Sequence, residues 1–126
     1  MQDRPTASEL LTDIADLLTD EVVPALEGGT QHHVRVAANL CRIVEREVRL
    51  GPALDVEEER LLRELVPDAD PTDDIPALHD RLIEAIRAGA VDDEACRQAL
   101  VSITRGKLAV AKPGYDGFDF AGEELG

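Results

Sequence analysis

The chain has 126 residues, with 27 acidic and 13 basic side chains and a formal net charge of −14. This length leaves room for one domain with one core, and the 44% hydrophobic content argues against a chain that is disordered throughout. The negative charge disfavours binding to nucleic acid or to an anionic membrane surface, and no apolar run reaches the ~18 residues of a membrane span.

The first predicted helix begins at Thr6 and Glu9, which have the spacing of a capping box. An apolar stripe follows at helical spacing. It consists of Leu10, Leu11, Ile14, Leu17, Leu18 and Val22. Pro24 is expected to kink or end this helix, and Gly28 with Gly29 to form the turn after it.

A second helix is predicted over residues 30–50, with Gly51 as its C-cap and Pro52 just beyond. Its apolar residues form two rows, which predicts a helix at the centre of a bundle. The first row is His33, Ala37, Leu40, Val44 and Val48, and the second is Val36, Ile43 and Leu50. A third helix is predicted over residues 55–66, ended by Pro67.

Residues 68–74 form an acidic, proline-containing segment that predicts a loop. A fourth helix should follow Asp74, with Pro76 in its first turn, and end at Gly89. The fifth should span residues 92–112, with Gly106 as a close-packing or weak point. No period-two pattern appears, so we predict an all-α antiparallel bundle of about five helices over residues 1–113, followed by an acidic aromatic tail over 114–126.

Catalytic and metal-binding motifs find little support in the sequence. Residues 68–72 spell Asp-x-Asp-x-Thr, the phosphatase motif, but a helix precedes them where that chemistry needs a buried strand. The same segment lacks the glycine and the final glutamate of a calcium loop, so an acidic capping loop is the better interpretation. His32 and His33 point about 100° apart on a helix and cannot share a metal. We predict no metal, no cofactor and no catalytic residue, which leaves an enzyme unsupported without excluding it.

One positive stripe stands out on the second predicted helix, where six polar residues alternate at spacings of three and four. They are His32, Arg35, Asn39, Arg42, Arg46 and Arg49. One interpretation pairs this arginine stripe with carboxylates such as Glu45, Glu64 or Glu84. The other is an anion site for a phosphate-bearing ligand or for the acidic tail, since arginine suits carboxylate and phosphate.

The three aromatic residues of the chain, Tyr115, Phe118 and Phe120, all lie in the tail. Aromatic side chains are large apolar anchors that dominate cores and interfaces. Three interpretations stay open: a solvated tail, a tail docked on its own bundle or on a second subunit, and a linear motif for a different protein.

Several segments resemble a family of small bacterial all-helical proteins of unknown function. They are DRPTASELL at 3–11, EVVPAL at 21–26, HVRVAAN at 33–39, IVERE at 43–47 and KLAV at 107–110. That family is encoded near aminoglycoside-phosphotransferase-like kinases and acyl-CoA dehydrogenases. The resemblance implies a helper role in acyl-CoA or small-molecule metabolism and supplies no catalytic residues; it does not extend to Phe118 and Phe120.

These observations favour a non-enzymatic helical accessory or interaction protein that forms a homo-oligomer and contacts a partner enzyme. The alternative is a small-molecule-binding protein or enzyme subunit that holds a phosphate-bearing ligand such as CoA at the arginine stripe. Cys41 and Cys96 fit free thiols, and no signal peptide is evident, so we expect a cytoplasmic protein.

Overall fold

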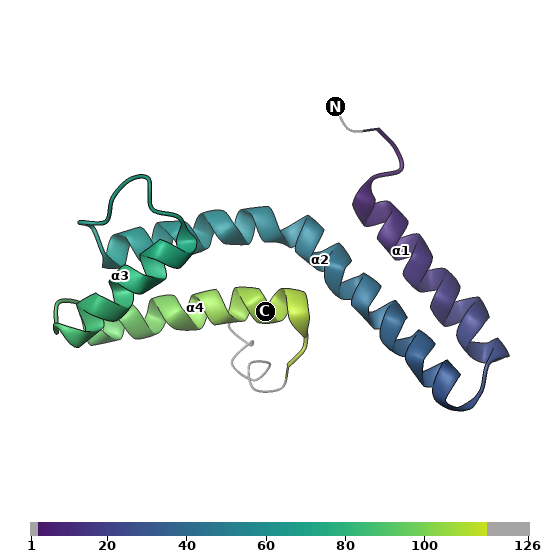
Figure 1. Cartoon of the computed structure of the whole chain (residues 1–126). Helices are drawn as coiled ribbons and strands as arrows, with labels where there is room; N and C mark the ends of the chain where they lie inside the picture. Colours follow the sequence, from purple (N-terminus) through teal and green to yellow (C-terminus); the bar gives the residue numbers. More distant parts are fainter. Residues whose placement is uncertain (1–2, 116–126) are drawn as a thin grey trace. The chain divides into compact units, whose positions relative to one another are not determined.

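A computed structural model describes residues 3–115, and every regular element in that range is helical. Four α-helices are present in this range: α1 (Ala7–Leu17), α2 (Gly28–Leu65), α3 (Ile75–Arg87) and α4 (Asp93–Ala111) (Figure 1). A π-helical turn, Leu18–Val22, and a 3₁₀ turn, Val23–Ala25, continue from α1. The all-α prediction is confirmed, whereas the expected count of five helices is wrong.

The described chain divides into two compact units, and the boundary falls inside α2. Unit 1 contains residues 3–51 and 109–115, and unit 2 contains residues 52–108. Each unit therefore contains part of α2 and part of α4, together with one helix of its own, which is α1 in unit 1 and α3 in unit 2.

The count differs because α2 continues through Gly51 and Pro52, joining the helices predicted over 30–50 and 55–66. An interior proline removes one helical hydrogen bond, at a cost of about 3 kcal/mol. Gly51 does not adopt the left-handed conformation expected of a C-cap, which is found at Gly28, Gly89 and Gly114. Packing beyond the proline favours the helix: Leu54 lies so close to Gly106 that a Cβ there would come within 2.9 Å of Leu54 Cδ2.

The other helix boundaries follow the predicted local signals. The capping box of α1 is complete, because the Glu9 backbone N–H donates to Thr6 Oγ1 (3.1 Å) and the Thr6 N–H donates to Glu9 Oε1 (2.8 Å). Asp74 caps α3 by accepting from the Ala77 N–H at 3.0 Å. Asp92 accepts from the N–H of Ala95 at 2.8 Å at the start of α4.

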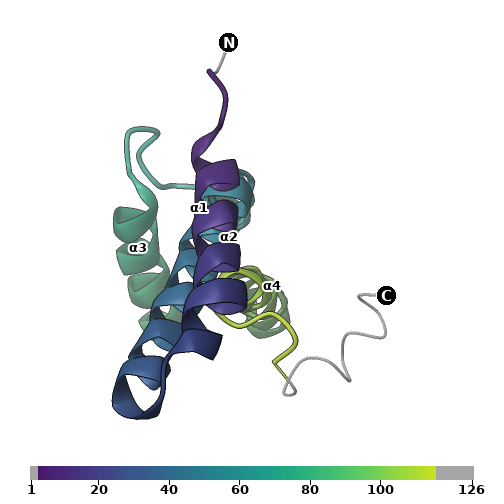
Figure 2. The ribbon, with the colours of Figure 1, turned by 90° about the vertical axis from the view of Figure 1, so that its right-hand side faces the viewer.

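In unit 1, α1 runs antiparallel beside the first part of α2, as both views show (Figures 1 and 2). The Ser8 hydroxyl donates to the Glu45 carboxylate at 2.5 Å, and an ion pair joins Arg42 and Asp16 at 3.0 Å. The buried apolar residues of this unit are mostly small. They are Ala15, Val23, Ala38 and Val110.

Unit 2 has an enclosed aliphatic core drawn from α2, α3 and α4. Leu62 and Leu78 are completely buried at its centre. The remaining buried members of this cluster are Val66, Leu82, Cys96 and Ile103. The core of the described chain is therefore concentrated in unit 2.

The prediction that residues 30–50 form a central helix, buried on two sides, is wrong. Val36, Leu40, Val44 and Val48 are 43–53% exposed. His33, which belongs to the first predicted row with Leu40, is also exposed. The periodicity correctly identified an amphipathic helix, but periodicity alone cannot show whether another element covers the apolar side.

Candidate functional site

Unit 1 presents an apolar surface that we call the hairpin face. It is made of Leu10, Ile14 and Leu17 on α1 and Val36, Leu40, Val44 and Val48 on α2. Each of these seven side chains is 43–53% exposed. A surface with this many neighbouring large aliphatic residues marks an interaction site more often than an isolated exposed leucine does.

The apolar residues of α1 and those of α2 in the hairpin face border the same side of the helix pair. The buried residues Ala15 and Ala38 mark where α1 and α2 face each other. At 100° per residue, Asp16 and Arg42 lie on one flank of these positions, and their ion pair joins the two helices there. Most of the apolar residues lie in the opposite rotational sense, on the outer side of each helix and towards its other flank. In an antiparallel pair, both sets therefore border the flank opposite the ion pair.

The arginine stripe is engaged mainly by contacts within unit 1. Arg49 donates to Glu45 at 2.8 and 3.3 Å, while Arg42 pairs with Asp16. Glu45 is therefore a partner of the stripe as predicted, whereas Glu64 and Glu84 pair with Arg60 and Arg87 instead. Hydrogen bonds from Arg49, and then from Ser8, lower the pKa of the Glu45 carboxyl.

Arg46 has a different role, because its Nε donates to the backbone carbonyl of Val110 at 2.7 Å. Val110 is in the last turn of α4, where carbonyl groups lack helical partners. Arg46 thus caps the end of α4 within unit 1.

The N-terminal part of the arginine stripe makes fewer contacts than the rest of the stripe. His32, Arg35 and Asn39 are exposed, and Arg35 makes a long hydrogen bond to Gln31 at 3.4 Å. The His32 ring lies beside that of His33, with centroids 6.1 Å apart. Anion binding at the stripe stays a prediction, with these three residues as its most accessible portion.

A buried carboxylate in unit 2, which has two more exposed basic partners, escaped the sequence interpretation. Glu58 on α2 is 6% exposed, and it is the buried charged residue within the described chain. Its Oε2 lies 2.6 Å from His79 Nε2 on α3, and its Oε1 accepts from Lys107 Nζ on α4 at 3.3 Å. One carboxylate therefore joins all three helices of the unit.

The protonation of Glu58 reflects two opposing effects. Burial raises the pKa of its carboxyl, whereas hydrogen bonds and charge attraction from His79 and Lys107 lower it, and the net result is a lowered pKa. The carboxylate thus stays ionised at neutral pH. A sequence signal was available, since Glu58 lies four residues from both Leu54 and Leu62 on an apolar helix face.

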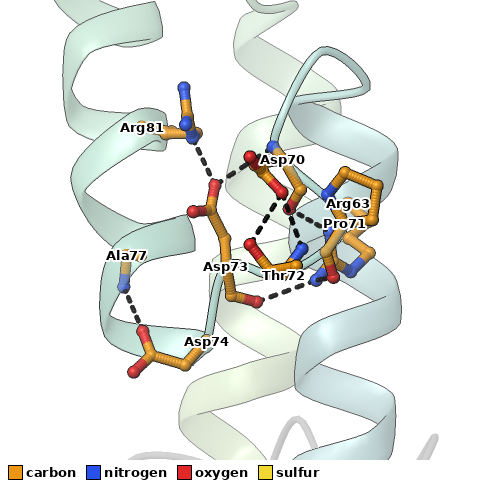
Figure 3. Close-up of polar contacts among 8 residues, drawn as sticks. All are labelled: Arg63, Asp70, Pro71, Thr72, Asp73, Asp74, Ala77 and Arg81. Carbon is orange, nitrogen blue, oxygen red and sulfur yellow. Dashed lines mark hydrogen bonds and ion pairs between the residues drawn. The ribbon is translucent and has the colours of Figure 1, made fainter.

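The acidic loop over residues 68–74 is held by hydrogen bonds within the loop and from neighbouring helices, as Figure 3 shows. Arg63 donates to three loop carbonyls, those of Asp70 (3.2 Å), Pro71 (3.2 Å) and Asp73 (2.8 Å). The Asp70 carboxylate accepts from the Thr72 backbone N–H (2.8 Å) and hydroxyl (2.7 Å), and these bonds lower the pKa of Asp70. The capping-loop interpretation is confirmed, and within residues 3–115 there is no group of three His, Cys, Asp or Glu side chains able to hold a metal.

Of the predicted docking tail, only Tyr115 belongs to the described chain. Its ring lies under Lys112, with Nζ 5.4 Å from the ring centroid. Phe118 and Phe120 lie outside the described residues, so docking of the tail stays a prediction.

Comparison with known families gives one match. Residues 24–115 match the family model DUF6285, a domain of unknown function. The chain belongs to the DUF6285 family. The region matched by the DUF6285 model contains α2, α3 and α4 and does not include α1.

No curated protein and no solved structure matches this DUF6285 chain. Among its described helices, none combines the length and the apolar character needed to cross a bilayer.

Proposed function

We propose that this DUF6285 protein is a non-enzymatic interaction protein that self-associates through the hairpin face. The observation that supports the proposal is the contrast in unit 1 between small buried residues and large half-exposed ones. A pair of helices with one bare apolar side is the half of a four-helix bundle that a second copy would complete.

The magnitudes favour association. Completing the burial of seven half-exposed aliphatic side chains on each of two copies would contribute about 10–20 kcal/mol, given roughly 1.5–3 kcal/mol for each full burial. Association costs an estimated 4–15 kcal/mol in lost translational and rotational freedom. The apolar contribution is thus comparable to or larger than this cost, which supports a reversible dimer.

Charge repulsion opposes this association, so the dimer should have a characteristic dependence on salt. Each copy carries a formal charge of −14, so two copies repel each other at low ionic strength. Salt screens this repulsion and leaves the apolar contact intact. Added salt should therefore tighten the dimer, whereas it would weaken a complex held by opposite charges.

The test is the solution mass as a function of concentration, measured by light scattering at two salt concentrations. Leu40→Lys places a charge in the middle of the hairpin face, where the side chain is 53% exposed and a folded monomer can accommodate it. The matched control is Val56→Lys, because Val56 is 70% exposed on the same helix but outside the face.

The proposal expects a dimer for the unmodified chain and for Val56→Lys, and a folded monomer for Leu40→Lys. A monomer at every concentration for the unmodified chain would refute self-association. A dimer that survives Leu40→Lys would refute the hairpin face as its site.

We extend the proposal to a cytoplasmic accessory role beside a partner enzyme. The alternative function is binding of a phosphate-bearing ligand such as CoA at the arginine stripe, for which the exposure of Arg35 and Asn39 is the supporting observation. A ligand-dependent rise in melting temperature separates this alternative from self-association.

A further inference from the structure

Unit 2 contains a hollow that self-association through the hairpin face does not use. It has a volume of about 360 Å³ and lies where the end of α2, the following loop and α3 meet. Its apolar lining is Leu65, Val66, Pro67, Ala69, Ala85 and Ala90. This size and this lining are typical of a site for a small organic molecule.

The charges around the hollow are predominantly negative. Asp68, Asp80 and Glu84 contribute carboxylates, and Arg81 contributes the cation. Arg81 is already neutralised, because its Nε donates to the carboxylate of Asp73 in an ion pair (Figure 3). The hollow therefore combines an apolar lining with a rim on which carboxylates outnumber cations.

These carboxylates differ in how far the described chain engages them, and Glu84 is the one with a partner. Among residues 3–115, no side chain forms a hydrogen bond or ion pair with the carboxylates of Asp68 and Asp80, and Glu84 makes a longer contact with Arg87 at 3.6 Å. Asp80 and Glu84 are four residues apart on α3, so their charges repel across one helical turn. A cation placed between them would relieve this repulsion.

We propose that the hollow binds an amphipathic organic cation, with the hydrocarbon part on the alanine- and leucine-lined wall and the ammonium or guanidinium group at Asp80 and Glu84. The acidic rim supports a cation over an anion or a neutral lipid-like molecule. The apolar lining supports an organic cation over a metal ion, which would gain nothing from the contact with Leu65 and Ala85.

The experiment compares three probes of equal chain length: hexylammonium, hexanol and hexanoate. Each is titrated into the full chain while the backbone amide signals of Ala69, Ala85 and Ala90 are followed by NMR. The proposal expects these signals to shift at hexylammonium concentrations at least about tenfold lower than those needed with hexanol. The reason is that hydrogen bonds between charged groups are stronger than those between neutral groups. Hexanoate should leave them in place.

Two variants and a control define the site. Asp80→Asn with Glu84→Gln should abolish the preference for hexylammonium. Asp13→Asn with Asp55→Asn removes the same net charge from exposed positions outside the hollow and should preserve it. Ala90→Leu, at an exposed wall position, should block both hexylammonium and hexanol without unfolding the chain.

Equal responses to hexylammonium and hexanol would overturn the proposal, as would a preference that survives Asp80→Asn with Glu84→Gln. Shifts confined to residues outside the hollow would overturn it as well. None of these results depends on the solution mass, so the hollow and the hairpin face are tested separately.

Discussion

The two units bury their apolar residues to different extents. Unit 2 encloses Leu62 and Leu78 completely, and its three helices are joined by the buried carboxylate of Glu58. Unit 1 buries mainly Ala15, Val23 and Ala38, while its larger side chains on the hairpin face stay about half exposed. Unit 2 thus has a core of its own, whereas unit 1 resembles one half of a core.

This difference divides α2 into a segment that contributes to an enclosed core and a segment whose larger apolar residues are half exposed. The same helix, α2, supplies the enclosed Leu62 after Pro52 and half-exposed aliphatic residues before it. Under the proposed self-association, α2 supplies a core segment after Pro52 and an interface segment before it. Substitutions in each segment of α2 separate these two contributions.

The largest effect is expected from truncating leucines in the two segments of α2. Leu62→Ala should lower the free energy of unfolding by about 2–5 kcal/mol, because it opens a cavity in an enclosed core. Leu40→Ala, measured at concentrations where the chain is monomeric, should cost much less, because Leu40 is 53% exposed. Urea unfolding followed by circular dichroism measures the free energy of unfolding of each variant. Equal decreases for the two variants would show that the two segments of α2 do not differ in burial.

Glu58→Gln is expected to have an intermediate effect. The amide keeps the size of the side chain but loses the charge that attracts Lys107 and His79, at a cost of about 1–3 kcal/mol. Glu57→Gln is the control, because Glu57 forms an exposed pair with Arg60 and should matter little. Comparable losses for the two variants would contradict a special role for the buried carboxylate.

Acidification should remove the contribution of Glu58. Its folded-state pKa lies below the ordinary glutamate value of about 4.5, so the folded state holds fewer protons than the unfolded state around that pH. The stabilisation is therefore complete above about pH 4.5 and is lost as the pH falls through the lowered pKa. Urea midpoints of the unmodified chain and Glu58→Gln should converge between pH 6 and pH 3, and a constant difference would refute this assignment.

A smaller effect is expected at the helix end that Arg46 caps. Arg46→Met keeps most of the aliphatic stem but removes the donor to the Val110 carbonyl, which should cost about 0.5–1.5 kcal/mol. Arg35→Met should leave stability nearly unchanged, since Arg35 is exposed and makes only a long contact. Thermal melting of both variants measures the difference, and equal melting temperatures would exclude the cap.

The smallest effect is expected from anions. Arg42, Arg46 and Arg49 are already engaged within unit 1, so millimolar phosphate or CoA should change the melting temperature little. A rise of several degrees that disappears in Arg35→Met would favour the alternative function, binding of a phosphate-bearing ligand at the arginine stripe.

Local signals in the sequence were sufficient for most helix boundaries. The caps at Thr6, Asp74 and Asp92 and the glycine at position 89 act within one turn of the chain, so a short segment contains the information that places them. The family resemblance likewise pointed correctly to an all-helical domain of unknown function.

Features that depend on distant residues were less accessible. Whether Pro52 ends a helix depends on packing such as that of Leu54 against Gly106, which lies 52 positions later. Periodicity located the stripe around Leu40 and Val44 but could not reveal that it is uncovered in unit 1. The partners of Glu58 are also distant in sequence, at 21 and 49 positions, although its place on an apolar helix face could have been noticed.

Amide hydrogen exchange at two protein concentrations is the most direct test of the contrast between the units. Slow exchange in residues 55–66 and in α3 should be independent of concentration, because unit 2 encloses its own core. Exchange in α1 and residues 30–48 should slow as the concentration rises, because a second copy covers the hairpin face. Protection of α1 that is strong and independent of concentration at every dilution would contradict the account.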